Sequence, residues 1–115
     1  MHVGSSYCIG GNNEYSNINI VKLICGLLNE KVSFNRNFYD QITFVADRPG
    51  HDLRYAINNS FIVKELGWQP KYTFEEGLNK TVDWYLANQQ WCENIINKND
   101  FISERIGLNI NIKKN

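Results

Sequence analysis

Residues 17–31 read NINIVKLICGLLNEK and carry the clearest structural signal in the chain. Asn17 precedes an apolar repeat and is expected to cap a helix, because its side-chain oxygen can accept a hydrogen bond from a first-turn amide. We expect the helix to end near Lys31. The apolar positions recur at the spacing of one helical face, and they are Ile20, Val21, Ile24, Leu27 and Leu28.

Two further helices have clear boundaries in the sequence. Asn58 or Asn59 is expected to cap a helix that Gly67 terminates, since glycine adopts the left-handed conformation that ends helices. Thr73 and Glu76 have the spacing of a capping box and open the next helix. The buried face of that helix is predicted to carry Leu78, Val82, Tyr85 and Leu86.

A fourth helical stretch is predicted over residues 89–97, and two or three short strands are predicted elsewhere. The strand candidates are residues 6–10, 41–47 and 54–57, of which 41–47 alternates most clearly. The expected fold is therefore an α+β, helix-rich domain with two or three short strands. A pair of short strands is marginal by itself, so this sheet needs helix cover or pairing with something outside the chain.

Length and charge limit what the chain can be. Its 115 residues fit one domain, and twelve basic side chains balance twelve acidic ones. This balance argues against a nucleic-acid partner or an anionic-membrane partner, either of which usually requires a basic patch. No apolar run is long enough to span a membrane, and the first residues do not resemble a signal peptide. We therefore expect a cytoplasmic protein.

The three cysteines give no sign of a disulfide framework or a zinc site. Cys8, Cys25 and Cys92 are odd in number, and they lie far apart without the spacing of metal ligands. We interpret them as apolar residues of a reducing compartment, in or near the core. No metal is expected.

The most informative polar segment is DRPGHDLRY, residues 47–55, in which two arginines, a histidine and two aspartates fall close together. Pro49 and Gly50 constrain the turn between Asp47, Arg48 and His51. Because the planar guanidinium of arginine matches phosphate oxygens, the segment indicates an anion site, most plausibly for a phosphate or diphosphate.

Simpler interpretations remain open at this stage. Arg48 and Arg54 could pair with Asp47 and Asp52 on a solvated turn. Asn17 could be a plain helix cap, or its helix N-terminus could also face a bound phosphate. His51 could be an ordinary surface histidine, because one histidine in a loop is weak evidence for catalysis.

Several motifs of complete nucleotide-dependent enzymes are absent from the sequence. It contains no GxGxxG or GxxxxGK[ST] loop, no tyrosine followed four residues later by lysine, and no GxSxG elbow. The residues alone therefore favour a binding module over a complete enzyme.

Five stretches closely resemble the dTDP-glucose 4,6-dehydratases, a sugar-nucleotide family within the extended short-chain dehydrogenases. The resemblance runs from about residue 5 to residue 97 without an evident gap. It is most specific in the segment around Arg48 and His51. The matching stretches are CIGGNNE at 8–14, QITFVADRPGHDLRYAI at 41–57, KELGWQP at 64–70, TFEEGL at 73–78 and KTVDWYLAN at 80–88.

The resemblance concerns the C-terminal part of such enzymes, which forms most of the nucleotide-sugar pocket. It implies that residues 1–97 are a nucleotide-sugar-binding subdomain and that residues 98–115 are a divergent, frayed tail. It also implies that Asn17, Arg48 and His51 contact the dTDP portion of a dTDP-sugar, with Asp47, Pro49 and Gly50 completing the loop. His51 is assigned by position only.

The same resemblance implies no cofactor in this chain. Family members bind NAD in an N-terminal Rossmann domain that also carries the Tyr/Lys pair, so dehydratase activity is not expected from these residues alone. Two departures affect the assignment. Cys8 stands where the family usually has asparagine, and residues 100–105 lack the usual tryptophan-containing ending.

An alternative function follows from the missing half. A chain that kept this fold without the Rossmann part would expose apolar surface and sheet edge, which favours self-association. It could then serve as a non-catalytic binding or interaction protein that forms a homo-oligomer through the exposed face.

Overall fold

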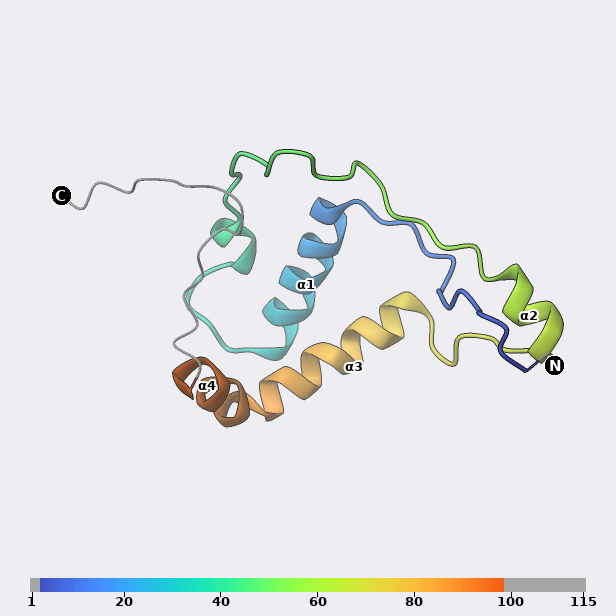
Figure 1. Cartoon of the computed structure of the whole chain (residues 1–115). Helices are drawn as coiled ribbons and strands as arrows, with labels where there is room; N and C mark the ends of the chain where they lie inside the picture. The colour runs from blue at the N-terminus through green and yellow to red at the C-terminus, as the bar shows by residue number, and fades with distance from the viewer. Residues whose placement is uncertain (1–2, 99–115) are drawn as a thin grey trace.

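The structure is a computed structural model that describes residues 3–98. It contains four α-helices and one short 3₁₀ helix, and residues 42–59 form one long connection without helix or strand (Figure 1). In chain order the elements are α1 (Asn17–Lys31), η1 (Phe38–Gln41), α2 (Ser60–Leu66), α3 (Phe74–Ala87) and α4 (Gln89–Lys98). None of the helices in the described part is long and apolar enough to cross a membrane.

The predicted start of α1 is wrong by one residue. Ser16, not Asn17, is the N-cap, and its side chain accepts a hydrogen bond from the Asn19 amide at 3.3 Å. Asn17 is the first helical residue. Serine and asparagine are almost equally good caps, so composition could not separate these neighbours. The predicted end at Lys31 is confirmed.

The other helix boundaries follow the predicted signals. Gly67 ends α2 in the left-handed conformation with φ 63°, and Asn59 precedes this helix without making a side-chain cap. Thr73 and Glu76 form both hydrogen bonds of the capping box at the start of α3. Each of these signals depends only on residues a few positions apart, so the sequence alone is enough to predict where these helices begin or end.

The main packed unit is formed by α1, η1 and α3. Cys25 of α1 and Val82 of α3 are buried, and the Cys25 thiol lies 3.5 Å from the Phe38 carbonyl oxygen. Lys31 and Asp83 join the two long helices through an ion pair of 2.7 Å. A small apolar cluster therefore holds α1 against α3, with α4 following at the far end of α3 (Figure 1).

The second packed unit surrounds α2, which lies on the opposite side of the molecule from α4 (Figure 1). Ile62 is buried, and the ring of Phe61 stacks on Tyr7 with centroids 5.1 Å apart. Asn59 is also buried, and its amide donates to the Gly10 carbonyl at 2.6 Å and accepts from Asn12 at 2.8 Å. These polar bonds fasten the N-terminal segment to the start of α2.

The predicted α+β class is wrong, because residues 3–98 contain no strand. Residues 6–10, 41–47 and 54–57 form no strand ladder, and only residue 41 of these belongs to an element, η1. Residues 5–15 and 50–59 do run side by side in opposite directions (Figure 1), but side chains join them. A strand needs backbone partners at regular spacing, and here they are lacking.

Part of the predicted apolar face of α3 is also wrong. Val82 is buried and Leu78 and Leu86 are half-buried, whereas Tyr85 is 55% exposed. Tyr85 instead packs edge-on against Trp84, which in turn meets Trp91 of α4 in the same geometry at 5.2 Å. These rings cover one another at the α3–α4 junction without closing a core.

The predicted tail, residues 98–115, lies outside the described residues from position 99 onward. Lys98 is the last residue of α4.

Candidate functional site

A cavity of about 600 Å³ lies where the segment before α1 meets the segment that follows the Pro49–Gly50 turn. The N-terminal turn of α1 forms one wall, and Phe74 at the start of α3 closes another. The lining includes Asn17 and His51, two of the residues predicted to bind substrate. The remaining lining residues are Asn13, Glu14, Tyr15, Ser16, Ile20, Asp52, Leu53, Arg54, Tyr55 and Phe74.

The other four predicted site residues lie in the adjoining turn and do not line the cavity. Gly50 has φ 69°, a left-handed conformation that residues other than glycine adopt at a free-energy penalty. Asp47 accepts a hydrogen bond from the Arg48 amide at 2.7 Å, and the His51 amide donates back to the Arg48 carbonyl. These backbone bonds close the turn and bring the side chains of Arg48 and His51 next to each other.

The Arg48 guanidinium contacts the imidazole of His51. Its Nε and Nη2 atoms lie 3.3 and 3.1 Å from His51 Nδ1. Arginine has no acceptor, so Nδ1 must accept and the proton of the neutral imidazole resides on Nε2. His51 is therefore a hydrogen-bond donor at Nε2.

The alternative pairing of the arginines with Asp47 and Asp52 is wrong. Within the described residues, neither arginine forms an ion pair with either aspartate. Arg54 instead binds Glu14 through two hydrogen bonds, of which the Nε bond is 2.8 Å. Asp52 accepts a hydrogen bond from the Tyr55 hydroxyl at 2.6 Å.

Glu14 and Arg54 are functional candidates that sequence reasoning did not single out as a pair. Their mutual hydrogen bond, reinforced by charge, lowers the pKa of Glu14 and raises that of Arg54. Both side chains are largely exposed, so solvent and salt screen the attraction. The pair joins the two segments that line the cavity. Forty positions separate the partners, and no local pattern could have linked them.

Tyr15 fixes the other side of the cavity. Its ring stacks on Phe74 with centroids 4.2 Å apart, and its hydroxyl donates to Glu75 at 2.7 Å. That hydrogen bond raises the pKa of Tyr15 and lowers the pKa of Glu75. The segment before α1 is thus fastened to α3 as well as to Arg54.

The N-terminus of α1 offers further donors to the cavity. The Ser16 carbonyl oxygen accepts hydrogen bonds from the backbone amides of Asn19 and Ile20, so these two amides are already paired. Within residues 3–98, the amides of Asn17 and Ile18 form no hydrogen bond. First-turn amides and the helix dipole favour a negatively charged group at this position.

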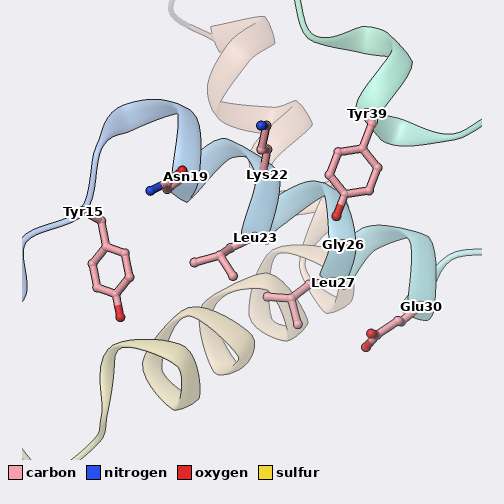
Figure 2. Close-up of a pocket in the computed structure, with 8 residues that line it drawn as sticks. All are labelled: Tyr15, Asn19, Lys22, Leu23, Gly26, Leu27, Glu30 and Tyr39. Carbon is pink, nitrogen blue, oxygen red and sulfur yellow. The ribbon is translucent and has the colours of Figure 1, made fainter.

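A neighbouring hollow of about 500 Å³ on α1 has different chemistry. Figure 2 shows Leu23 and Leu27 projecting from α1, with the rings of Tyr15 and Tyr39 at its sides. The Tyr39 hydroxyl approaches Gly26 closely, where an added Cβ would lie 3.0 Å from it. Its lining contains one cationic side chain, Lys22, and no arginine or histidine, so the cavity beside His51 is the better candidate for an anionic ligand.

Within the described part of the chain, no three His, Cys, Asp or Glu side chains gather closely enough to hold a metal ion. The donor set beside the cavity comprises a guanidinium, an imidazole N–H and two helix amides. Groups of this kind bind anionic oxygens, and the carboxylates of Glu14 and Asp52, which also line the cavity, limit where an anion can bind.

Comparison with known proteins gives a consistent family. Residues 1–81 match the family described as GDP-mannose 4,6 dehydratase. The dTDP-glucose 4,6-dehydratase of Shigella flexneri is 56% identical over 92 residues, which are 80% of this chain and 26% of that protein. The Neisseria meningitidis enzyme of the same name is 50% identical over 91% of this chain and 30% of its own length.

A solved structure agrees in fold. The dTDP-glucose 4,6-dehydratase of Bacillus anthracis, crystallised in complex with NAD, is 46% identical and superposes with a TM-score of 0.60 over 74% of this chain and 24% of that one. The chain thus spans between a quarter and a third of the length of its curated relatives. It belongs to the GDP-mannose 4,6 dehydratase family, and within that family it resembles the dTDP-glucose 4,6-dehydratases.

Proposed function

We propose that this chain binds the diphosphate of a dTDP-sugar in the cavity between the N-terminus of α1 and residues 51–55. The observation that carries the proposal is that Asn17 and His51, distant in sequence, line one cavity, with the Arg48 guanidinium against the His51 ring. The relatives named dTDP-glucose 4,6-dehydratase support the choice of nucleotide.

Arg48 and His51 would divide the work of recognition. The guanidinium is exposed and carries five N–H donors in a planar fork, so it can grip phosphate oxygens in two-point fashion. Because Arg48 holds Nδ1, the Nε2–H of His51 is left to donate to a second oxygen. The free amides of Asn17 and Ile18 extend the same donor set across the cavity.

The proposed role is binding, with the hydride chemistry done elsewhere. The sequence contains neither the glycine-rich dinucleotide fingerprint nor a tyrosine followed four residues later by lysine. The Bacillus anthracis relative was solved with NAD, and the chain aligns with only 24% of it. These residues would hold the thymidine diphosphate while NAD is bound by other parts of a complete enzyme.

A two-dimensional NMR titration of the whole chain with dTDP, and with UDP for comparison, tests the proposal. We expect saturable shifts at Asn17, Arg48 and His51, stronger for dTDP, with an affinity of about 1 mM if one or two charge-assisted contacts form. Arg48→Ala should weaken binding about tenfold, the loss expected for one charge-assisted contact.

Arg36→Ala is the matched control, because Arg36 is an exposed arginine in the loop before η1, outside the cavity lining. It should leave the affinity unchanged. If Arg48→Ala and Arg36→Ala lowered the affinity for dTDP equally, the binding would come from general charge attraction and not from a specific Arg48 contact. The absence of shifts at several millimolar dTDP would refute the proposal, and turnover of dTDP-glucose by this chain would refute the separation of binding from chemistry.

A further inference from the structure

The rings of Trp84, Tyr85 and Trp91 form an exposed aromatic cluster where α3 meets α4. Trp84 contacts both of the other rings edge-on, with its centroid 5.2 Å from each of theirs. Their exposed fractions are 45%, 55% and 53%, so about half of each residue is open to solvent. Because the three rings are in contact, their exposed faces belong to one continuous apolar surface.

The short connection between the two helices fixes the position of the aromatic cluster. Asn88 alone separates α3 from α4, and its side-chain amide donates to the Trp84 carbonyl at 2.8 Å. The first turn of α4 follows at once, since the Cys92 amide donates to the Asn88 carbonyl. A segment that binds the cluster therefore meets rings that are already in place and does not have to order them.

The size of the aromatic cluster favours a tethered segment over a separate protein as its partner. Aromatic side chains bury about 150–250 Å² each, so the exposed parts of these three amount to roughly 300 Å². Each partner in a standard protein interface buries about 800 Å², which is more than the cluster offers. A segment of the same chain needs less area, because its tether supplies a high effective concentration.

The sequence that follows α4 has the composition and the reach to cover these rings. Residues 106–112 read IGLNINI, in which every second residue is large and apolar. In an extended backbone the four apolar side chains point to one side and the asparagines to the other. Trp91 lies seven residues before the end of α4 at Lys98, about 10 Å along the helix. The connection 99–105 can span about 23 Å, so it is long enough for the chain to turn back to the rings.

We propose that residues 106–112 fold back within the same chain and cover the aromatic cluster with their apolar side. The contact removes the rings and the four apolar side chains from water, which is the main favourable term in such an association. Ile95, 37% exposed and one helical turn after Trp91, extends the apolar surface toward the end of α4. This docking would hold part of a tail that the family resemblance predicts to be frayed.

Tryptophan fluorescence of the whole chain tests the contact. In a Trp68→Phe background, Trp84 and Trp91 are the two remaining tryptophans. Leu108→Asp with Ile110→Asp should raise their quenching by acrylamide and shift their emission to longer wavelength, because charged side chains do not stay against apolar rings. The quenching constant should rise about twofold if half of the accessible ring surface becomes uncovered.

The matched control is Asn109→Asp with Asn111→Asp, which adds the same charge on the other side of the segment. It should leave the quenching unchanged. Circular dichroism should be the same for both double variants, since all four positions lie outside α1 to α4. An equal rise in quenching for the two double variants would overturn the proposal, as would no rise for Leu108→Asp with Ile110→Asp.

Nuclear Overhauser effects locate the contact and show that it forms within one chain. We expect them between the indole protons of Trp84 and Trp91 and the methyl groups of residues 106–112. Quenching should not depend on protein concentration between about 10 and 200 μM, a range in which a dimer of micromolar affinity dissociates. Methyl contacts to Phe44 instead, which is 82% exposed, would overturn the proposal. Quenching that falls as concentration rises would also overturn it, because a second copy would then cover the rings.

The outcome is independent of the dTDP titration. None of the three residues of the aromatic cluster lines the cavity between the N-terminus of α1 and residues 51–55. A chain that binds dTDP without docking its tail, or docks its tail without binding dTDP, would contradict one proposal and leave the other standing.

Discussion

Glu14 and Arg54 are the charged contact that joins the two segments beside the cavity. Their hydrogen bonds connect positions that no helix brings together. Because both side chains are largely exposed, the pair contributes orientation more than stability. It holds the wall of the cavity in place only while the carboxylate is ionised.

This dependence predicts a titration with a defined direction. The hydrogen bond and charge of Arg54 lower the pKa of Glu14 from its ordinary value of 4.5. A lowered folded-state pKa means that the contact is fully present above the ordinary pKa and is lost as pH falls through the lower folded value. The Arg54 Nε–H resonance should therefore titrate with a midpoint below 4.5, and the resonance of Arg36 should not follow it. A midpoint at or above 4.5 would contradict the pairing.

Single residues also show how far sequence reasoning reaches. Asn17 and His51, which the family resemblance assigns to the substrate site, line one cavity, and their contact with a substrate stays a prediction. The sequence could not predict that the Arg48 guanidinium contacts His51 Nδ1, or that Arg54 binds Glu14 and not Asp52. Each arginine has several acidic or accepting neighbours in sequence, and the choice among them depends on how distant segments approach.

Among the elements, α3 has the most complete local specification. Thr73 accepts from the Glu76 amide at 3.2 Å, and Glu76 accepts from the Thr73 amide at 2.9 Å. Thr81, inside the same helix, uses its hydroxyl differently and donates to the Gly77 carbonyl at 2.8 Å. Thr73 therefore caps an amide at the start of α3, whereas Thr81 donates to a backbone carbonyl inside the helix.

The same substitution is predicted to have different effects at the two threonines. Thr73→Ala leaves the Glu76 amide in the first turn of α3 without its side-chain acceptor and should lower the free energy of unfolding by about 1 kcal/mol. Thr81→Ala removes a back-bond that slightly weakens helices and adds a better helix former, so stability should be unchanged or higher. Urea unfolding followed by circular dichroism measures both. Equal destabilisation by the two substitutions would show that the capping box adds nothing.

The contrast between helices and strands explains which elements the sequence could predict. Caps, Gly67 and apolar repeats act over a few residues, so α1 to α4 were predictable to within one or two residues. The alternation in residues 41–47 is equally clear, but it indicates only that successive side chains would point to opposite sides of an extended backbone. Whether that segment becomes a strand depends on a partner. Within the described chain, the two segments that do run side by side, 5–15 and 50–59, bond to each other through side chains.

At the scale of the whole molecule, the buried side chains of residues 3–98 fall into two separate groups. Cys25 and Val82 lie between α1 and α3, whereas Asn59 and Ile62 lie beside α2. Among the described elements, α2 packs against no other helix, and extended segments connect it to the remainder (Figure 1). With two small clusters, the described part of the chain has no single core to make its unfolding cooperative.

The two clusters should therefore open independently, as amide hydrogen exchange can show. Ile62→Ala removes the buried side chain of α2 and should speed exchange in α2 by roughly thirtyfold, for a loss of about 2 kcal/mol, while α1 and α3 keep their protection. Val82→Ala should do the reverse, exposing α1 and α3 and sparing α2. Each variant is the control for the other, and a uniform loss of protection in both would mean that the chain unfolds as one unit.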